Sequence, residues 1–367
     1  MTTTNGCAAC ASQPFRIFFV LAAGAASAGV LPWLTGGWPV SMTAVVWHRE
    51  MLLFGMVPAV LAGFLLTALP RWTRSLPVPR RVVHVLMALW LAGRLVHLWS
   101  PEVAAPIAAS FILSIAILVA VRVVKSGAIR EIKVVSLLIF LAMAAAALDV
   151  MPANLRLRLA LAAILGLIAV IGGRIAPALT ASYLALRKAQ FGGQLPESFE
   201  VAAALSLVIA LGLWSFDADG QGPASLAAAV LQGARFLAWR PWRVVGQPGL
   251  VAIHLAYAWI PLGLGLNALR STGLDVSGNA ILHAWAAGAI GAICLAAMAS
   301  MARRQSRQAF SRPAGSLAMV VAGLGAAPLR LLAELGMPFL LHLAALCWSA
   351  AFLLFVAAYR RPLGLAR

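Results

Sequence analysis

The amino-acid sequence predicts an all-α fold, a polytopic transmembrane helix bundle of about twelve spans with both the N- and the C-terminus in the cytoplasm. Of its 367 residues, 63% are hydrophobic and 10% are charged, whereas soluble domains carry about 25% charged residues. The mean hydropathy is +0.95. The apolar residues form long runs without the alternation of a β-barrel strand, and these runs are long enough for membrane-crossing helices. A soluble fold is therefore excluded.

Each expected span is an apolar run that ends at a charge cluster or at a Pro/Gly turn. We expect residues 1–14 to be a short cytoplasmic tail and residues 15–367 to form a single integral-membrane helical domain. The expected spans are 15–33, 44–69, 82–98, 103–121, 134–150, 157–178, 199–216, 224–239, 249–269, 277–301, 315–333 and 338–358.

The orientation follows from the positions of the basic residues. With the N-terminus inside, the inner segments carry 20 Lys and Arg residues and the outer loops carry 4. Cytoplasmic loops of membrane proteins are enriched in Lys and Arg in this way. The net charge of +18 is thus typical of a multi-pass inner-membrane protein, and we expect the lipid bilayer, not nucleic acid, as its partner.

Two cysteines, Cys7 and Cys10, form a C-x-x-C before the first expected span. Two thiols supply half of a tetrahedral metal site. Two interpretations stay open, an incidental tail and a copper or redox contact.

The densest group of chemically active residues is Trp47-His48-Arg49-Glu50, at the outer start of the second expected span. Ionisable residues inside a span are costly unless they are paired or hydrated. In one interpretation this is an interfacial helix end, where Arg49 reaches water and His48 faces a loop. In the other interpretation, His48 is an axial haem ligand or a copper ligand. Glu50 is then a direct or a more distant partner that fixes the tautomer of the His48 imidazole.

Four of the six histidines fall in the expected outer half of the membrane: His48, His97, His283 and His342. His283, about six residues into its span, is the best buried partner for His48. His97 and His342 are weaker candidates.

The other two histidines lie toward the inner side. His254 precedes Tyr257 by one helical turn, and it belongs either to a second site or to the far side of one deep cofactor pocket. His84 stands at an inner span end, where we expect a solvated boundary residue.

Two arginines inside the spans, Arg94 and Arg174, are also candidates. Arg174 follows Gly172-Gly173, and glycines allow a backbone or a planar ring to approach closely. Arg174 is suited to pair with a carboxylate such as a haem propionate, or else it reaches for the membrane boundary.

Six segments, in order along the chain, resemble the signature segments of the NnrS family. They are PFRIFF (14–19), WHREMLLFG (47–55), AGFLLTALPRWT (62–73), GGRIAPALT (172–180), IHLAYAWIPLGL (253–264) and LHAWAAGAIG (282–291).

This resemblance implies a twelve-span bacterial membrane protein that binds haem and copper and is linked to nitric oxide metabolism, denitrification and nitrosative stress. It also implies that the family's polar positions are held here by His48, Glu50, Arg174, His254, Tyr257 and His283. The family often reads W-H-x-H-E-M in the second span, and here Glu50 stands where the second histidine would be. After the tenth span, a G-H-T-G-R segment of the family is replaced by residues 300–307. The chain either holds haem without copper or binds its metals with altered ligands.

We therefore expect a haem protein whose iron meets nitric oxide or electrons, ligated by His48 and His283 or by His254. A donor protein or a quinol would supply the electrons, and whether the protein is an enzyme stays open. One alternative is a secondary transporter in which Arg49, Glu50, Arg94 and Arg174 line the path of a small anion. Another is a non-catalytic nitric oxide sensor or scaffold.

Overall fold

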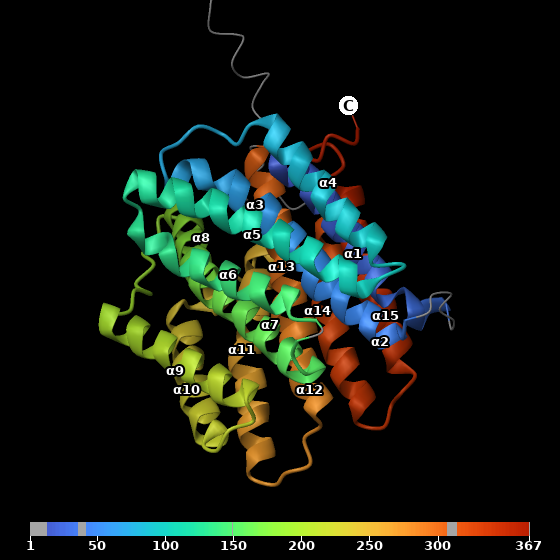
Figure 1. Cartoon of the computed structure of the whole chain (residues 1–367). Helices are drawn as coiled ribbons and strands as arrows, with labels where there is room; N and C mark the ends of the chain where they lie inside the picture. The colour runs from blue at the N-terminus through green and yellow to red at the C-terminus, as the bar shows by residue number, and fades with distance from the viewer. Residues whose placement is uncertain (1–12, 36–41, 149, 307–313, 367) are drawn as a thin grey trace, which may run out of the picture. The chain divides into compact units, whose positions relative to one another are not determined.

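A computed structural model describes residues 13–35, 42–148, 150–306 and 314–366, and all regular elements in these ranges are helices (Figure 1). Apart from the short 3-10 helices η2 (Ile129–Glu131) and η4 (Pro241–Val244), twelve continuous helical segments result when helices that run directly into one another are joined, and each overlaps one expected span. They are α1 (Pro14–Thr35), α2–η1–α3 (Ala44–Met51, Leu52–Met56, Val57–Trp72), α4 (Arg80–Val96), α5 (Pro101–Ser126), α6 (Ile132–Ala146), α7–η3–α8 (Ala153–Leu167, Ile168–Gly172, Gly173–Leu186), α9 (Glu197–Ser215), α10 (Gln221–Ala238), α11 (Pro248–Ser271), α12–η5–α13 (Gly278–His283, Ala284–Gly291, Ala292–Gln305), α14 (Ala314–Glu334) and α15 (Leu340–Ala358).

Nine of these segments are long and apolar enough to cross a membrane, counted over the described residues. The other three are α4, α6 and α10, which are 17, 15 and 18 residues long. The chain is therefore a membrane protein with an all-helical fold. Twelve crossings and cytoplasmic termini stay predictions.

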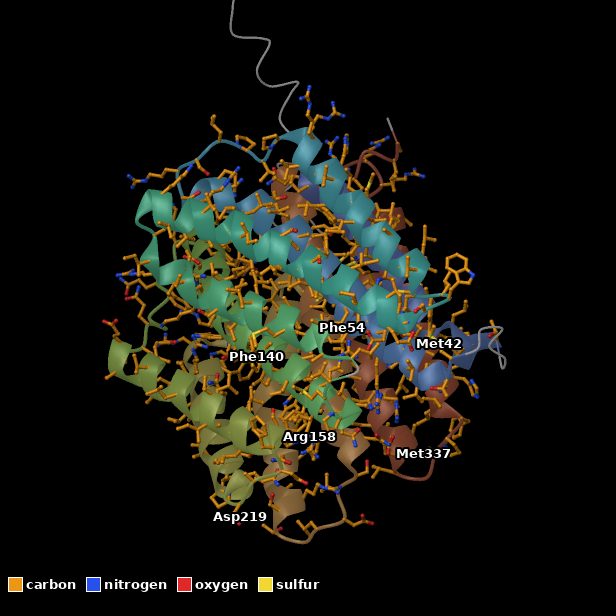
Figure 2. The ribbon with its side chains drawn as sticks, viewed as in Figure 1. Met42, Phe54, Phe140, Arg158, Asp219 and Met337 are labelled. Atoms are coloured by element: carbon orange, nitrogen blue, oxygen red, sulfur yellow. The ribbon has the colours of Figure 1, made fainter. Side chains whose placement is uncertain are left out.

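Large apolar side chains on the outer helix faces support the same conclusion. Phe54 is 2% exposed, whereas Phe140 on α6 is 37% exposed; both are labelled in Figure 2. Val124 on α5 and Val208 on α9 are also exposed. Faces of this kind are stable against lipid but would be an aggregation hazard in water.

The chain divides into two compact units. Unit 1 comprises Met1–Pro32, Gly37–Ala160 and Tyr359–Arg367, and unit 2 comprises Trp33–Gly36 and Leu161–Ala358. In unit 1, α5 packs against α3, α4 and α6. In unit 2, α11 packs against α8, α10, η5, α13 and α14, and α14 lies beside α15 (Figure 1). The expected single domain over residues 15–367 stays a prediction.

Three π-helical segments interrupt the long helices: η1, η3 and η5. Each one overlaps a signature run of the sequence. All of η1 except Met56 lies in WHREMLLFG, η3 shares only Gly172 with GGRIAPALT, and η5 lies in LHAWAAGAIG. Single π-turns inside α-helices occur frequently at functional sites. They shift main-chain carbonyls out of the α-helical pattern, and two of these carbonyls accept side-chain donors, Gly55 from Trp90 and Ala169 from Arg235.

Glycines in unit 2 make room for indole rings. A Cβ on Gly263 would collide with Trp285, and one on Gly288 with Trp259. The small residues in the LHAWAAGAIG run thus allow close packing of large rings.

Candidate functional site

A buried ion pair joins Glu50 to Arg156 in unit 1. Glu50 is 5% exposed and Arg156 is 6% exposed. Nη1 of Arg156 donates to Oε1 of Glu50, and Nη2 donates to Oε2 at 3.1 Å. A bidentate pair of this kind is the arrangement that compensates best for taking both charges out of water.

The same guanidinium also caps the end of α6. Nε of Arg156 donates to the carbonyl of Ala144 at 2.9 Å, and Nη2 donates to that of Ala145 at 3.2 Å. The last carbonyls of a helix have no partner within the helix. The ring of Phe54 lies 4.4 Å from the guanidinium carbon and covers one face of this planar group.

A second arginine of unit 1, Arg94, is also buried, with 7% exposure. Its Nη1 donates to the main-chain oxygen of Glu50 at 3.0 Å. One helical turn later, His97 stacks on Trp47, with ring centroids 5.8 Å apart and an interplanar angle of 26°. Trp47 and Glu50 on α2 therefore face His97 and Arg94 at the end of α4.

Proline explains how α2 docks on α1. Pro32 lies inside α1 and has no amide hydrogen, so the carbonyl of Ala28, four residues earlier, lacks its helical donor. The indole nitrogen of Trp47 donates to this carbonyl at 2.7 Å. The next residue, His48, bonds through Nδ1 to the carbonyl of Gly29 at 3.0 Å.

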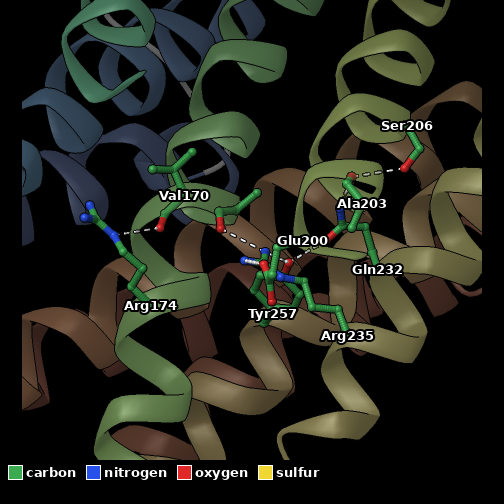
Figure 3. A network of polar contacts seen from close by, with 9 residues as sticks. Val170, Arg174, Glu200, Ala203, Ser206, Gln232, Arg235 and Tyr257 are labelled. Carbon is green, nitrogen blue, oxygen red and sulfur yellow. Dashed lines mark hydrogen bonds and ion pairs between the residues drawn. The ribbon is translucent and has the colours of Figure 1, made fainter. Parts of the chain in front are cut away.

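In unit 2, a polar network surrounds Arg235 (Figure 3). Its Nη2 forms an ion pair of 2.5 Å with Glu200, and its Nη1 donates to Tyr257 Oη at 2.8 Å and to the carbonyl of Ala169 at 3.0 Å. Tyr257 donates in turn to Gln232 Oε1 at 2.5 Å, and Gln232 donates to the carbonyl of Ala203 at 2.7 Å. The network ties α9, α10, α11 and η3 together.

The glycine gap expected to serve Arg174 is filled by Arg235. A Cβ on Gly173 would collide with the guanidinium of Arg235. Arg174 itself is exposed, and its Nε donates to the carbonyl of Val170 at 3.3 Å (Figure 3). The planar group admitted by this glycine is therefore a neighbouring arginine side chain.

His254 is fixed in the interior of unit 2, where it is 1% exposed. Thr180 donates its hydroxyl proton to the carbonyl of Ala176 at 2.9 Å, so its oxygen accepts the Nε2 proton of His254, at 2.8 Å. This arrangement assigns the neutral Nε2–H tautomer. Nδ1 is then an unprotonated, buried nitrogen without a hydrogen-bond partner among the described residues.

Two other histidines of unit 2 bond to main-chain carbonyls. Nδ1 of His283 bonds to Asn279 at 2.8 Å, and Nδ1 of His342 bonds to Trp33 at 2.7 Å. A carbonyl only accepts, so Nδ1 carries the proton in both rings, as it does in His48. In the neutral form of each ring, Nε2 then holds the lone pair.

The candidates from sequence analysis divide between the two units. Unit 1 brings Glu50, Arg94 and His97 together, with half-buried His48 and Arg49 on the same helix as Glu50. Unit 2 brings Tyr257 and His254 into one aromatic cluster with Trp239, whose ring lies 4.5 Å from that of Tyr257 and 6.2 Å from that of His254. His48 and His283 belong to different units, so their pairing stays a prediction. Cys7 and Cys10 lie outside the described residues.

Sequence reasoning missed several residues of these clusters. Arg156 directly precedes the expected span 157–178 and so falls in an expected outer loop, and Arg235 falls inside the expected span 224–239. Glu200, Gln232 and Thr180 were not considered. The sequence feature that could have pointed to these clusters is an arginine within an apolar run, because a charge in the membrane interior requires a partner.

The donor set can be compared with the two cofactors that the resemblance implies. Among the described residues, no three His, Cys, Asp or Glu side chains lie close enough together to hold a metal ion. These residues therefore do not fit a copper site with three or more such ligands. Haem needs only one or two imidazoles, and His48, His254 and His283 each offer an oriented ring.

These features define the class: an integral-membrane helical protein with a buried arginine–glutamate pair in unit 1 and, in unit 2, a buried arginine paired with a half-buried glutamate. A family described as NnrS protein matches residues 9–367. The chain therefore belongs to the NnrS family. A comparison with curated proteins finds no match.

Proposed function

We propose that the protein is a haem protein of the bacterial inner membrane that acts in nitric oxide metabolism or in the response to nitrosative stress during denitrification. Membership of the NnrS family over nearly the whole chain supports a role related to nitric oxide. Bound haem would supply an iron centre that binds nitric oxide and exchanges electrons.

The observation that carries the proposal is the orientation of two imidazoles beside π-helical segments. His48, four residues before η1, and His283, directly before η5, each use Nδ1–H on a main-chain carbonyl. Histidines that bind metals almost always donate their other ring N–H to such a group, which fixes the ring and makes Nε2 the ligating nitrogen. One such imidazole is enough for a haem with an open position.

His254 is the alternative ligand within the same proposal. It is more deeply buried than His48 or His283, and its unpartnered nitrogen is Nδ1. Because Nδ1 is bonded to Cγ, a ligand on this nitrogen would lie closer to the backbone than a ligand on Nε2. His48 and His283 are therefore the preferred haem ligands in this proposal.

Single substitutions of the histidines test the proposal. The full-length protein is purified in detergent, and its haem content and Soret absorption are measured for His48→Ala, His283→Ala and His254→Ala. The matched control is His84→Ala, because His84 is exposed on α4. We expect loss or a shift of the Soret band in one or more of the first three variants and no change in the control. A colourless wild-type protein without iron would contradict the proposal.

Turnover is tested separately from binding. Steady-state consumption of nitric oxide with a quinol or a reduced donor protein would indicate an enzyme. Binding of nitric oxide without consumption would indicate a sensor or a scaffold. An enzyme and a sensor are both compatible with bound haem. The transporter alternative would instead be supported by a protein without haem that takes up a small anion when it is placed in vesicles.

A further inference from the structure

Two helices of unit 1 contact each other at two points. Trp47 on α2 stacks on His97, and one turn along each helix the main-chain oxygen of Glu50 accepts from Arg94. Gly55 lets Arg94 lie close to the backbone, since a Cβ there would be 3.2 Å from its Cδ. Arg94 and His97 are therefore held side by side in the protein interior.

The buried charges of this cluster do not balance. Glu50 contributes −1, and Arg94 and Arg156 contribute +1 each, which leaves +1 when His97 is neutral. Glu102, a further carboxylate on this side of unit 1, is exposed and accepts from Ser100 Oγ at 2.9 Å. A buried net charge is costly unless a counter-charge is bound.

The unbalanced cation is also the one with unused donors. Arg156 places each of its three nitrogens on a carboxylate oxygen or a carbonyl. Arg94 has five N–H groups. Within the described part of the chain, one of them donates a hydrogen bond, from Nη1 to the main-chain oxygen of Glu50. His97 is also buried, with 1% exposure, and its Nε2 has no hydrogen-bond partner among the described residues.

We propose that Arg94 and His97 form a binding site for a small, planar anion with one negative charge and at least two oxygen atoms. A monoanion brings the charge of the cluster to zero. The guanidinium fork matches two oxygens on one planar centre, and Nε2–H of His97 donates to the same ligand. Nitrate, nitrite and small carboxylates share this chemistry.

Anion binding is measured on the full-length protein in detergent. The thermal midpoint of unfolding is followed during titration with nitrate, and separately with formate, while chloride keeps the ionic strength constant. Equilibrium dialysis gives the stoichiometry. A ligand that binds only the folded state raises the midpoint in a saturable way. The two titrations distinguish an inorganic oxyanion from a carboxylate.

Four substitutions and one matched control complete the test. Arg94→Gln is expected to weaken binding at least tenfold, His97→Phe several-fold, and Arg94→Lys less than Arg94→Gln. Glu50→Gln leaves the cluster at +2 and is expected to tighten binding, even if it lowers the midpoint. The control Arg122→Gln also removes one cation from unit 1, where Arg122 bonds to Ser75 and Leu76.

The expected result is saturable binding of one nitrate or formate per chain that depends on Arg94 and His97 and not on Arg122. Unchanged affinity in Arg94→Gln would overturn the proposal, as would the absence of saturable binding of either anion. The opposite effects of Arg94→Gln and Glu50→Gln separate a binding site from a general loss of stability, because both variants disturb the same cluster.

Discussion

Glu50 and Arg156 form a two-point ion pair across 106 residues of sequence, and both side chains are almost fully buried. The pair joins the start of α7 to the end of α2, and Arg156 additionally caps α6. It therefore fixes the helix that carries His48 relative to the rest of unit 1.

Removal of one partner of this pair should be strongly destabilising. Glu50→Gln leaves a buried guanidinium without its counter-charge, and the expected loss in the free energy of unfolding is about 3–5 kcal/mol. Thermal or denaturant unfolding in detergent measures this loss. Glu197→Gln is the control, since Glu197 is exposed at the start of α9.

A double substitution tests whether the unpaired charge is responsible for the loss of stability. In Glu50→Leu with Arg156→Met no charge of the pair remains, and most of the stability should return, because apolar groups of similar volume often replace buried ion pairs. If the double variant is as unstable as the single one, loss of the α6 cap is the main cause.

Tyr257→Phe should destabilise unit 2 by about 1–3 kcal/mol, because Gln232 Oε1 loses its donor and Arg235 loses one of its acceptors in the interior. A double-mutant cycle with Gln232→Leu provides the control. Coupling between the two substitutions is expected, and strictly additive effects would contradict the bond between these residues.

Gly173→Ala should lower stability by about 1–3 kcal/mol, because its Cβ would push against the guanidinium of Arg235. Gly212→Ala in α9 is the matched control, since nothing lies within 4 Å of the added Cβ there. That variant should be neutral or more stable by about 0.5–1 kcal/mol. Equal effects of the two substitutions would mean that Arg235 does not lie against Gly173.

Thr180→Val keeps the shape of the side chain but removes the acceptor for Nε2–H of His254. The expected cost is about 1–3 kcal/mol, because a buried ring nitrogen loses its partner. Thr180→Ser retains the hydroxyl and should lie much closer to the wild type. Unfolding measurements on both variants decide the point, and a similar loss in both would show that the methyl group matters more than the bond.

Much of the fold could be predicted from the sequence. Apolar runs that end at charge clusters correspond to the twelve helical segments, because a lipid-embedded backbone must satisfy its hydrogen bonds within each helix. The π-helical segments were not predicted, since hydrophobic pattern alone does not distinguish a π-turn from an α-turn.

The candidate site was only partly predictable. Glu50, Arg94 and His254 are candidates from their position inside spans, and Tyr257 is one from the family resemblance; the structure places all four in the interior. Their partners were not identified, because pairs such as Glu50 with Arg156 are set by the packing of distant helices. Arg156 was placed in a loop since its span was expected to start at residue 157, whereas α7 starts at Ala153.

The central claim is that the protein carries haem on an imidazole ligand and that nitric oxide binds to the iron. The most direct measurement is the absorption spectrum of the purified, reduced protein before and after addition of nitric oxide, together with the haem content per chain. We predict a Soret band that shifts on addition of nitric oxide and that is lost or altered in His48→Ala or His283→Ala. A haem-free protein, or a Soret band that neither shifts nor responds to any histidine substitution, would contradict the account.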